Sequence, residues 1–483
     1  MIAEPGRGQV FKFHFWPCDP PLTHFSHRHR NPHRTPVVTP KMKFEDLTPE
    51  RAAPTNVRWN VFSLAFAISA LLYLHRYVFA FIKPTLAEEY KLSNTQLGQL
   101  DSAFSVCYAG FQFPLGIAAD VLGVHLVLTG LIVLWCAAMG LMAWAPSVSW
   151  LWFSRAALGT GQSAVYACLS RVARTWYPPA VRTTLQGSVG VLAGRLGALS
   201  SSVVFTTLLL GVWGLDWRSA VWILVAVGVV NALLFVVVFR NSPREHSGVN
   251  EAEARLIEGE VGLRGATPAL GFRATLRAMT PRSLMNLIWL SLQNVLSTFA
   301  DNIYSNWIPL FLSQVHGLKF KEMGIYSALP LLGGAVAGVT GGMLNDYLIV
   351  RTGNRRWSRV GVAFVGKGLA AVLMFVALIF FDRPYVFCSI LFFVKLFGDW
   401  SLTTNLGVIT DIGGKATASV YAFSNSIAGI ALIAAPMVFG PVSEHYGWRP
   451  VFVIVGVTYA LCALSWLVID CTIPVVSETP PEN

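Results

Sequence analysis

The run LVLTGLIVLWCAAMGLMAWA, at residues 126–145, carries no charged side chain and is long enough to cross a lipid bilayer. An α-helix rises about 1.5 Å per residue, so about 20 apolar residues span the roughly 30 Å hydrocarbon layer. The rest of the chain has the same character, since 54% of its 483 residues are hydrophobic and only 13% are charged. Soluble domains carry about 25% charged residues. The sequence therefore predicts a helical membrane protein and excludes most classes of soluble enzyme.

Twelve apolar runs of this kind follow one another from Val57 onward, separated by short polar breaks. They lie at approximately 57–82, 96–119, 126–145, 148–175, 182–210, 217–239, 283–312, 324–349, 358–381, 384–410, 416–440 and 448–470. A helix satisfies its own backbone hydrogen bonds, as a segment in lipid must. We therefore expect an all-α membrane protein with twelve transmembrane helices.

The longest polar gap, residues 241–282, divides these runs into two six-helix halves and is expected to be a cytoplasmic loop. We assign residues 55–240 to the N-terminal half, 283–470 to the C-terminal half and 471–483 to a C-terminal tail. Residues 1–50 form a basic tail rich in Pro, His and Arg, which we expect to be disordered. A metal-binding histidine tract is the more specific alternative for this tail, but no helical or strand spacing supports it. Met42 is a second candidate start.

The distribution of Lys and Arg predicts the orientation, because cytoplasmic loops of membrane proteins carry the excess of positive charge. With the N-terminus inside, the cytoplasmic loops hold 15 Lys and Arg residues, and the opposite loops, Lys83 included, hold 7. Both termini are therefore expected in the cytoplasm, and the protein in the inner or plasma membrane. The same rule accounts for the net charge of +11, so no nucleic-acid partner is expected. The scattered cysteines form no metal-binding pattern, and we expect neither a metal nor a cofactor.

The two halves repeat one another at two landmarks. The sequence GIAAD at 116–120 follows the second span, and GMLND at 342–346 follows the eighth, an offset of 226 between the aspartates. DWR at 216–218 precedes the sixth span and GWR at 447–449 the twelfth, an offset of 231 between the arginines. Two nearly equal offsets indicate a duplicated six-helix unit, and such repeats place a substrate path between the halves.

Together these features resemble the major facilitator superfamily of transporters over about residues 55–470. Several stretches are similar to its anion:cation symporter branch, which includes carriers for sugar acids, phthalate, glutamate and sialic acid. The stretches are YLHR at 73–76, SAF at 102–104 with Tyr108, RAALGTG at 155–161, WYP at 176–178 with Arg182, NIY at 302–304 with WIP at 307–309, and Asp411 with Asn425. The resemblance implies alternating access by two rocking halves, with conformational gating by Gly116, Asp120, Gly342 and Asp346.

Two departures from this branch bear on coupling. His75 stands where an acid commonly precedes the arginine of the first span, and Gln162 stands where a glutamate often follows the arginine of the fourth. Both usual carboxylate sites are therefore uncharged or, for His75, switchable near neutral pH. The loop after Asp120 also lacks the basic residues that the family usually carries there.

Two arginines lie deep in the spans, where a charge costs at least about 2.5 kcal/mol and needs a reason to be there. Arg76 and Arg155 each lie about 10 Å outward of the centre of their span, at about 1.5 Å per residue. Two guanidiniums at one height suit capture of a carboxylate by paired hydrogen bonds. The alternative is that both side chains reach outward to the lipid headgroups. With the motif present at both positions, we expect Arg76 and Arg155 to bind the substrate.

Arg195 lies at the centre of the fifth span and cannot reach a headgroup, so it needs a wet cavity or a partner. We expect a third anion contact there, and the alternative is a hydrogen bond to backbone carbonyls. Further candidate substrate contacts are polar or aromatic side chains, each of which could instead bond a neighbouring helix. They are Tyr73, Gln162, Asn302, Trp400 and Asn425.

Candidate coupling residues for a proton or a sodium ion are Asp301, His75 and Asp399. Asp301 has no partner nearby in the sequence, and histidine titrates near neutral pH when unperturbed. Lys395 and Asp399 are spaced i,i+4 on one helix, so we expect them to neutralise one another.

The sequence thus predicts a secondary transporter, not an enzyme, that moves a small organic anion such as a sugar acid by proton-coupled symport. One alternative is an organophosphate:phosphate antiporter, against which the lack of Lys and Arg in 286–312 counts. Others are an exporter of hydrophobic cations, for which Asp101 is the available acid of the N-terminal half, and an anion-binding membrane sensor. The expected partners are the organic anion, the coupling ion and the lipid bilayer, and a monomer is expected.

Overall fold

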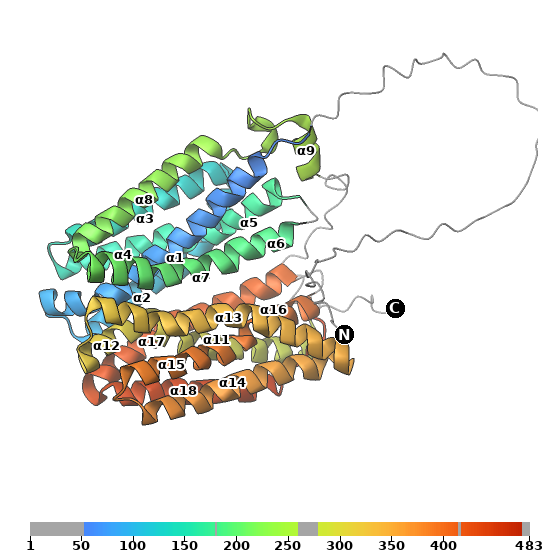
Figure 1. The fold of residues 1–483 in the computed structure, drawn as a ribbon. Helices are drawn as coiled ribbons and strands as arrows, with labels where there is room; N and C mark the ends of the chain where they lie inside the picture. Colours follow the sequence, from blue (N-terminus) through green and yellow to red (C-terminus); the bar gives the residue numbers. More distant parts are fainter. Residues whose placement is uncertain (1–52, 179–180, 259–278, 414–416, 476–483) are drawn as a thin grey trace, which may run out of the picture. The chain divides into compact units, whose positions relative to one another are not determined.

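The computed structural model describes residues 53–178, 181–258, 279–413 and 417–475, and these residues are helices joined by turns, without a strand among them (Figure 1). They all belong to one compact unit, Ala52–Asn483. The expected tail at 1–50, most of the C-terminal tail and the second half of the central loop lie outside the described residues.

Helices α1 to α8 come from the N-terminal part of the chain. They are α1 Val57–Tyr90, α2 Asn94–Leu122, α3 Val124–Trp144, α4 Val148–Ser163, α5 Val165–Trp176, α6 Arg182–Gly187, α7 Ala193–Ser200 and α8 Trp217–Val238. Two π-helical stretches, η2 Ser188–Leu192 and η3 Ser201–Val212, continue α6 and α7, so that Leu185–Val212 runs as one long helical segment.

The remaining helices follow the polar gap. They are the short η4 Pro243–Glu245 and α9 Glu251–Glu258, then α11 Pro281–Asn306, α12 Ile308–His316, α13 Phe320–Thr352, α14 Arg355–Ile379, α15 Pro384–Gly398, α16 Trp400–Gly413, α17 Thr417–Tyr446 and α18 Trp448–Trp466. Figure 1 shows α1–α8 gathered on one side and α11–α18 on the other.

Ten helical segments of the described residues are long and apolar enough to cross a membrane. Two of the twelve predicted runs, 148–175 and 283–312, are helical but fall outside this set. The first is divided at Ala164 into α4 and α5, each too short alone, and α11 in the second is too polar. These two runs supply Arg155 and Asp301 to the cavity described below.

Local sequence signals explain where the helices begin and end. Ser93 and Gln96 form a reciprocal capping box at the start of α2, and Thr280 with Ser283 does the same at the start of α11. Helix α1 ends at Tyr90 and is capped by Lys91, whose φ of 51° is left-handed. The start of α1 is capped by the central loop, because Glu253 of α9 accepts the backbone N–H of Arg58 at 3.1 Å and its guanidinium at 2.9 Å.

The two repeated tryptophan landmarks make equivalent contacts. The indole N–H of Trp217, at the start of α8, donates to Glu89 near the end of α1. That of Trp448, at the start of α18, donates to Gln314 near the end of α12. In each case the last long helix of a half is fastened to the end of its first span, as a duplicated unit predicts.

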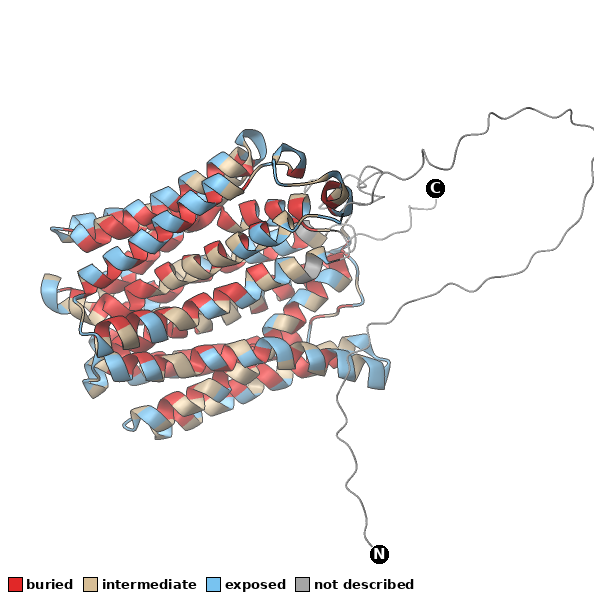
Figure 2. Ribbon diagram, turned by 45° about the horizontal axis from the view of Figure 1, so that its top comes forward, coloured by how far each residue is buried: buried red, intermediate tan, exposed pale blue. Residues whose placement is uncertain are grey.

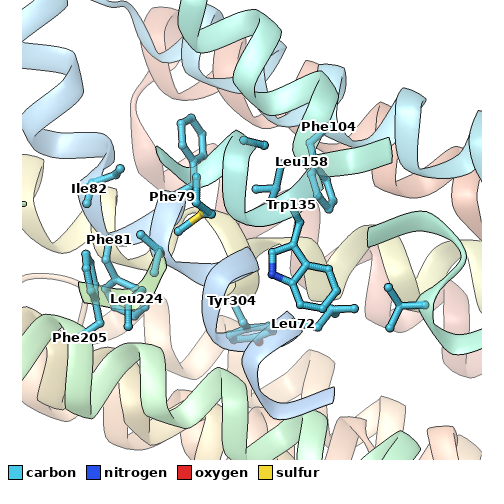
Figure 3. Close-up of a cluster of buried hydrophobic side chains, with 14 of the residues drawn as sticks. Leu72, Phe79, Phe81, Ile82, Phe104, Trp135, Leu158, Phe205, Leu224 and Tyr304 are labelled. Atoms are coloured by element: carbon cyan, nitrogen blue, oxygen red, sulfur yellow. The ribbon is translucent and has the colours of Figure 1, made fainter. Parts of the chain in front are cut away.

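The burial pattern is that of a protein in lipid. Large aromatic side chains fill the interior, among them Phe79, Trp135 and Phe205 (Figure 3). Exposed residues lie along the outward faces of the helices (Figure 2), and many of them are apolar: on α8, Val230, Leu233 and Val237 are 55–68% exposed. Water would penalise such a surface, whereas hydrocarbon accepts it. The chain is therefore a multi-pass membrane protein.

The two groups of helices meet closely at the end that carries the α1–α2 turn. Asn94 donates to Ser443 at 3.1 Å, and the backbone N–H of Thr95 donates to Glu444 at 2.9 Å. Gly98 of α2 lies so near α17 that an added Cβ would be 2.4 Å from the carbonyl oxygen of Pro436. A glycine is needed there because only the lack of a side chain lets the two backbones approach.

Candidate functional site

A cavity of about 360 Å³ lies between the two groups of helices. Small-molecule sites usually measure about 300–1,000 Å³, so this cavity suits a small ligand. Helices α1, α2, α4, α11 and α17 contribute its wall, which is strongly polar for a membrane interior. The polar and aromatic lining includes Tyr73, Arg76, Tyr77, Asp101, Phe104, Tyr108, Gln112, Arg155, Thr298, Asp301, Asn302, Ser305, Asn425 and Ser426.

Arg76 of α1 stands in this wall with part of its guanidinium unpaired. Its Nε donates to Gln162 at 3.0 Å, and its ring neighbours include Tyr108, at 4.7 Å from the guanidinium carbon to the ring centre, and Tyr73, at 5.1 Å. Its Nη2 is buried and has no hydrogen-bond partner. Aromatic faces stabilise a cation but do not accept its N–H groups in the plane, so this N–H lacks an acceptor among the described residues.

Arg155 of α4 lines the same cavity and is held by a carboxylate. Its Nη2 donates to Asp101 at 3.1 Å, its guanidinium carbon lies 4.0 Å from the ring centre of Phe79, and its buried Nη1 has no partner. Asp101 also binds the ammonium of Lys83, which is fully buried and donates to the backbone oxygen of Asn306 at 2.7 Å. Lys83, Asp101 and Arg155 are called the N-side triad below.

The two arginines predicted to act together therefore reach one cavity and do not extend toward headgroups. Gln162 is buried beside them, where its amide accepts from Arg76 and donates to the backbone oxygen of Leu72 at 3.2 Å. Gln162 is not part of the lining itself, whereas Tyr73, Asn302 and Asn425 are. The side-chain oxygen of Asn302 is buried without a partner.

A second charge network lies on the opposite side of the cavity. Asp301 of α11 accepts from Lys395 at 3.0 Å and from the hydroxyl of Tyr459 at 2.7 Å. Lys395 also donates to Asp399 at 2.6 Å, which confirms the predicted i,i+4 pair. Arg195 of α7 donates to Asp399 at 2.8 Å and so joins the two groups of helices. Asp301, Lys395, Asp399 and Arg195 are called the C-side network.

The structure gives Arg195 a partner that the sequence had not indicated. Its guanidinium donates to the carboxylate of Asp399, 204 residues away, and Arg195 is not part of the cavity lining. Its role as a third anion contact stays a prediction. Lys367 is near this network, since it donates to Ser297 at 2.8 Å and lies over the ring of Tyr459.

Besides Arg195 and Asp399, His75 and Trp400 also lie outside the cavity lining. His75 faces α3 and α8, where its ring meets Trp135 edge-on at 6.4 Å and lies close to Gly228. Trp400 donates its indole N–H to Thr340 at 3.0 Å and packs on Phe397. Neither residue contributes to the described wall of the cavity.

The four predicted gating residues lie near the C-terminal ends of α2 and α13. Asp120 pairs with Arg171 of α5, and both side chains are largely exposed. Gly116 has only Ala167 within contact distance of an added Cβ, and Gly342 has open space at that position. Asp346 is exposed. These contacts leave the ends of α2 and α13 accessible.

The sequence missed Lys83 and Tyr459 as members of the site. The sequence places Lys83 in a loop, whereas the structure places it inside α1 with no exposure. Its spacing of seven residues from Arg76 puts both on one face of a helix, a signal that was available. Tyr459 carried no such signal, because its contact with Asp301 joins α18 to α11.

The comparisons agree with this architecture. The model of the Major Facilitator Superfamily matches residues 65–378, and the chain belongs to that family of transporters. It is 33% identical over 429 residues to the probable sulfoacetate transporter of Cupriavidus necator, covering 86% of this chain and 93% of the relative. The hexuronate transporter of Escherichia coli is 25% identical, over 86% of this chain and 94% of its own length.

A third relative is the probable galactarate/D-glucarate transporter of Bacillus subtilis, 24% identical over 89% of this chain and 95% of the relative. Among solved structures, a bacterial homologue of the human lysosomal transporter Spinster, in an inward-facing and occupied conformation, matches with a TM-score of 0.68. It is 18% identical, covers 86% of this chain and 97% of its own length, and so shows the fold.

Proposed function

We propose that the protein is a secondary active transporter of a small organic anion, a carboxylate such as a sugar acid, and that it works by alternating access coupled to protons. In this proposal twelve spans form two six-helix halves, residues 55–240 and 283–470, with both termini and the loop at 241–282 in the cytoplasm. The ten apolar segments, the family and the relatives, whose names include transporters of sulfoacetate, hexuronate and glucarate, support it.

The observation that carries the proposal is the free edge of Arg76. A buried N–H of a charged group without a partner is costly, about 1–3 kcal/mol or more. Arg76 and Arg155 both line the cavity, and the cost is removed when they turn toward an anionic oxygen there, so that Nη2 of Arg76 and Nη1 of Arg155, which are buried without a partner, donate to it. Asn302 and Asn425 in the same wall can bond hydroxyl groups of such an anion.

The coupling residue that this geometry favours is Asp301, supported by Asp399. Asp301 lines the cavity and shares Lys395 with Asp399. A proton on Asp301 weakens its pair with Lys395, and Lys395 then turns wholly to Asp399. The protonation state of a residue in the substrate wall is thereby linked to the Arg195–Asp399 contact between the halves. His75 faces α3 and α8 instead of the cavity, so no step is assigned to it.

Alternating access requires the contacts around the α1–α2 turn to break when contacts at the other end of the helices form, and to form again when those break. With the N-terminus in the cytoplasm, that turn is extracellular, and the bonds of Asn94, Thr95 and Lys83 to the opposite half form an outer gate. The pairing of Asp101 with two cations removes the argument for a hydrophobic-cation exporter, which would need a free acid there.

The test is uptake of labelled organic anions into proteoliposomes under an imposed proton gradient. The panel contains hexuronates, aldonates, aromatic acids and glycerol phosphate, with Arg155→Ala as the inactive variant and Arg449→Gln, at an exposed ion pair with Asp382, as the matched control. Uptake of a carboxylate that Arg155→Ala abolishes and Arg449→Gln retains supports the proposal. Binding without uptake would support the sensor, and uptake of glycerol phosphate alone would support the phosphate antiporter.

A further inference from the structure

The charges around the cavity are unequal on its two sides, and from this we infer that the substrate is a compact dianion, with two negative groups, and not a monoanion. The inference rests on the proposed function and narrows its substrate class. It depends on the charge balance of two buried networks, in which Lys83 and Asp101 set the selectivity.

The side of the cavity that carries the N-side triad and Arg76, called the N side, holds an excess of positive charge. Arg76, Arg155 and Lys83 are three cations, and the described residues bonded to them include one carboxylate, Asp101. Asp101 is shared between Lys83 and Arg155, and Arg76 has no ionic partner among the salt bridges of the described residues. Two positive charges on this side are therefore unmatched.

The C-side network offers nothing to offset them. Asp301 and Asp399 are matched by Lys395 and Arg195 in a chain of contacts of 2.6–3.0 Å, so the network is neutral. Lys367, which donates to the Ser297 hydroxyl, adds a further positive charge nearby. The surroundings of the cavity thus carry at least two positive charges in excess when each group has its ordinary charge at neutral pH.

An excess charge inside a membrane requires a counter-ion, because hydrocarbon cannot solvate it. Arg76 and Arg155 lie on different helices and line one cavity, and each has one buried donor without a partner, so by turning toward the cavity they offer two points of attachment. A monoanion satisfies one unmatched charge and leaves the other. A dianion satisfies both, and it is therefore expected to bind more tightly than a monoanion of the same shape.

Lys83 provides a way to change the balance without altering the wall. It is fully buried but is absent from the cavity lining, so a substrate does not touch it. Lys83→Gln keeps a donor for Asn306 and removes one positive charge, which leaves Asp101 to Arg155 alone. Asp101→Asn has the opposite effect and adds one unmatched charge. A charge acts on a ligand in proportion to the ligand's own charge, so both variants change the dianion-to-monoanion preference, in opposite directions.

The experiment measures inhibition of uptake, or ligand-induced thermal stabilisation, by two matched pairs of anions at pH 7. D-glucarate and D-gluconate differ by one carboxylate in place of a hydroxymethyl group, and so do sulfoacetate and 2-hydroxyethanesulfonate. The wild-type protein is expected to prefer the dianion of at least one pair by about tenfold or more, which is about 1.4 kcal/mol. Lys83→Gln is expected to reduce that preference several-fold, Asp101→Asn to increase it, and the double variant to restore it.

Each readout is a ratio within one protein, so differences in expression or stability cancel. A wild-type ratio near one for both pairs overturns the inference and leaves the proposed function standing. Ratios in Lys83→Gln and Asp101→Asn that move together, or do not move, also overturn it. Failure of the wild-type protein to bind or transport any of the four anions, or any member of the wider panel, would overturn the proposed function itself.

Discussion

Gly98→Ala is predicted to weaken the outer gate by forcing α2 away from α17. A Cβ at this position would lie 2.4 Å from the Pro436 carbonyl oxygen, whereas ordinary contacts begin at 3.4 Å, so the backbones must separate by 1.0 Å. Overpacking of this kind costs about 1–3 kcal/mol. The cost falls only on the state in which the two halves touch here. It therefore shifts the equilibrium toward the outward-open state by about 5- to 150-fold.

The assay is thiol labelling of a cysteine placed in the cavity wall, Ser426→Cys, by a membrane-impermeant maleimide added outside right-side-out vesicles. Gly98→Ala is expected to raise the labelling rate of Ser426→Cys at least five-fold above the rate measured with the native Gly98. Gly110→Ala is the matched control, since it lies in the same helix and an added Cβ there meets nothing within 4 Å. Vesicles with the native cysteines alone give the background. Equal labelling of the two alanine variants would refute the reasoning that Gly98 permits closure.

Three further predictions concern charges. Asp301→Asn is expected to abolish proton-driven accumulation while retaining exchange of labelled for unlabelled anion across proteoliposomes; retained accumulation would remove Asp301 from coupling. In thermal unfolding in detergent, Asp399→Asn is expected to lower the melting temperature more than Arg195→Gln. Asp399→Asn leaves Arg195 unpaired, whereas in Arg195→Gln the carboxylate of Asp399 keeps its pair with Lys395. The double variant should lose less stability than the sum of the two single variants, and strict additivity would exclude coupling between Arg195 and Asp399. Glu253→Ala is expected to cost about 1–3 kcal/mol, since it uncaps α1 and frees Arg58, and an unchanged melting temperature would contradict this.

Helix positions were predictable because they follow from local properties of the chain. Each of the twelve apolar runs coincides with helix in the described residues. The repeated tryptophans marked equivalent helix starts, and the i,i+4 pair of Lys395 and Asp399 formed as spaced. Such features depend on neighbours within a few residues, and periodicity records them directly.

The partners of the buried charges were not predictable in the same way. Arg195 and Asp399 are 204 residues apart, and Lys395 and Asp301 are 94 apart. Their contacts depend on how each helix is rotated and which faces meet, which sequence spacing does not specify. His75 is different, because its position beside Arg76 in the sequence already turns it by about 100° around the helix, away from the face of Arg76. Lys83 was missed because a lysine at the end of an apolar run also suits a loop.

The most direct test of the central claim is the affinity of the purified protein for the anion that it transports best, measured by calorimetry. Arg76→Gln removes the free donor edge, and loss of a buried charged partner costs about 2–5 kcal/mol, so the dissociation constant should rise at least about 30-fold. Arg449→Gln, a change of the same type at an exposed site, should leave it within about threefold of the wild-type value. Binding by folded Arg76→Gln that equals the wild type would contradict the account.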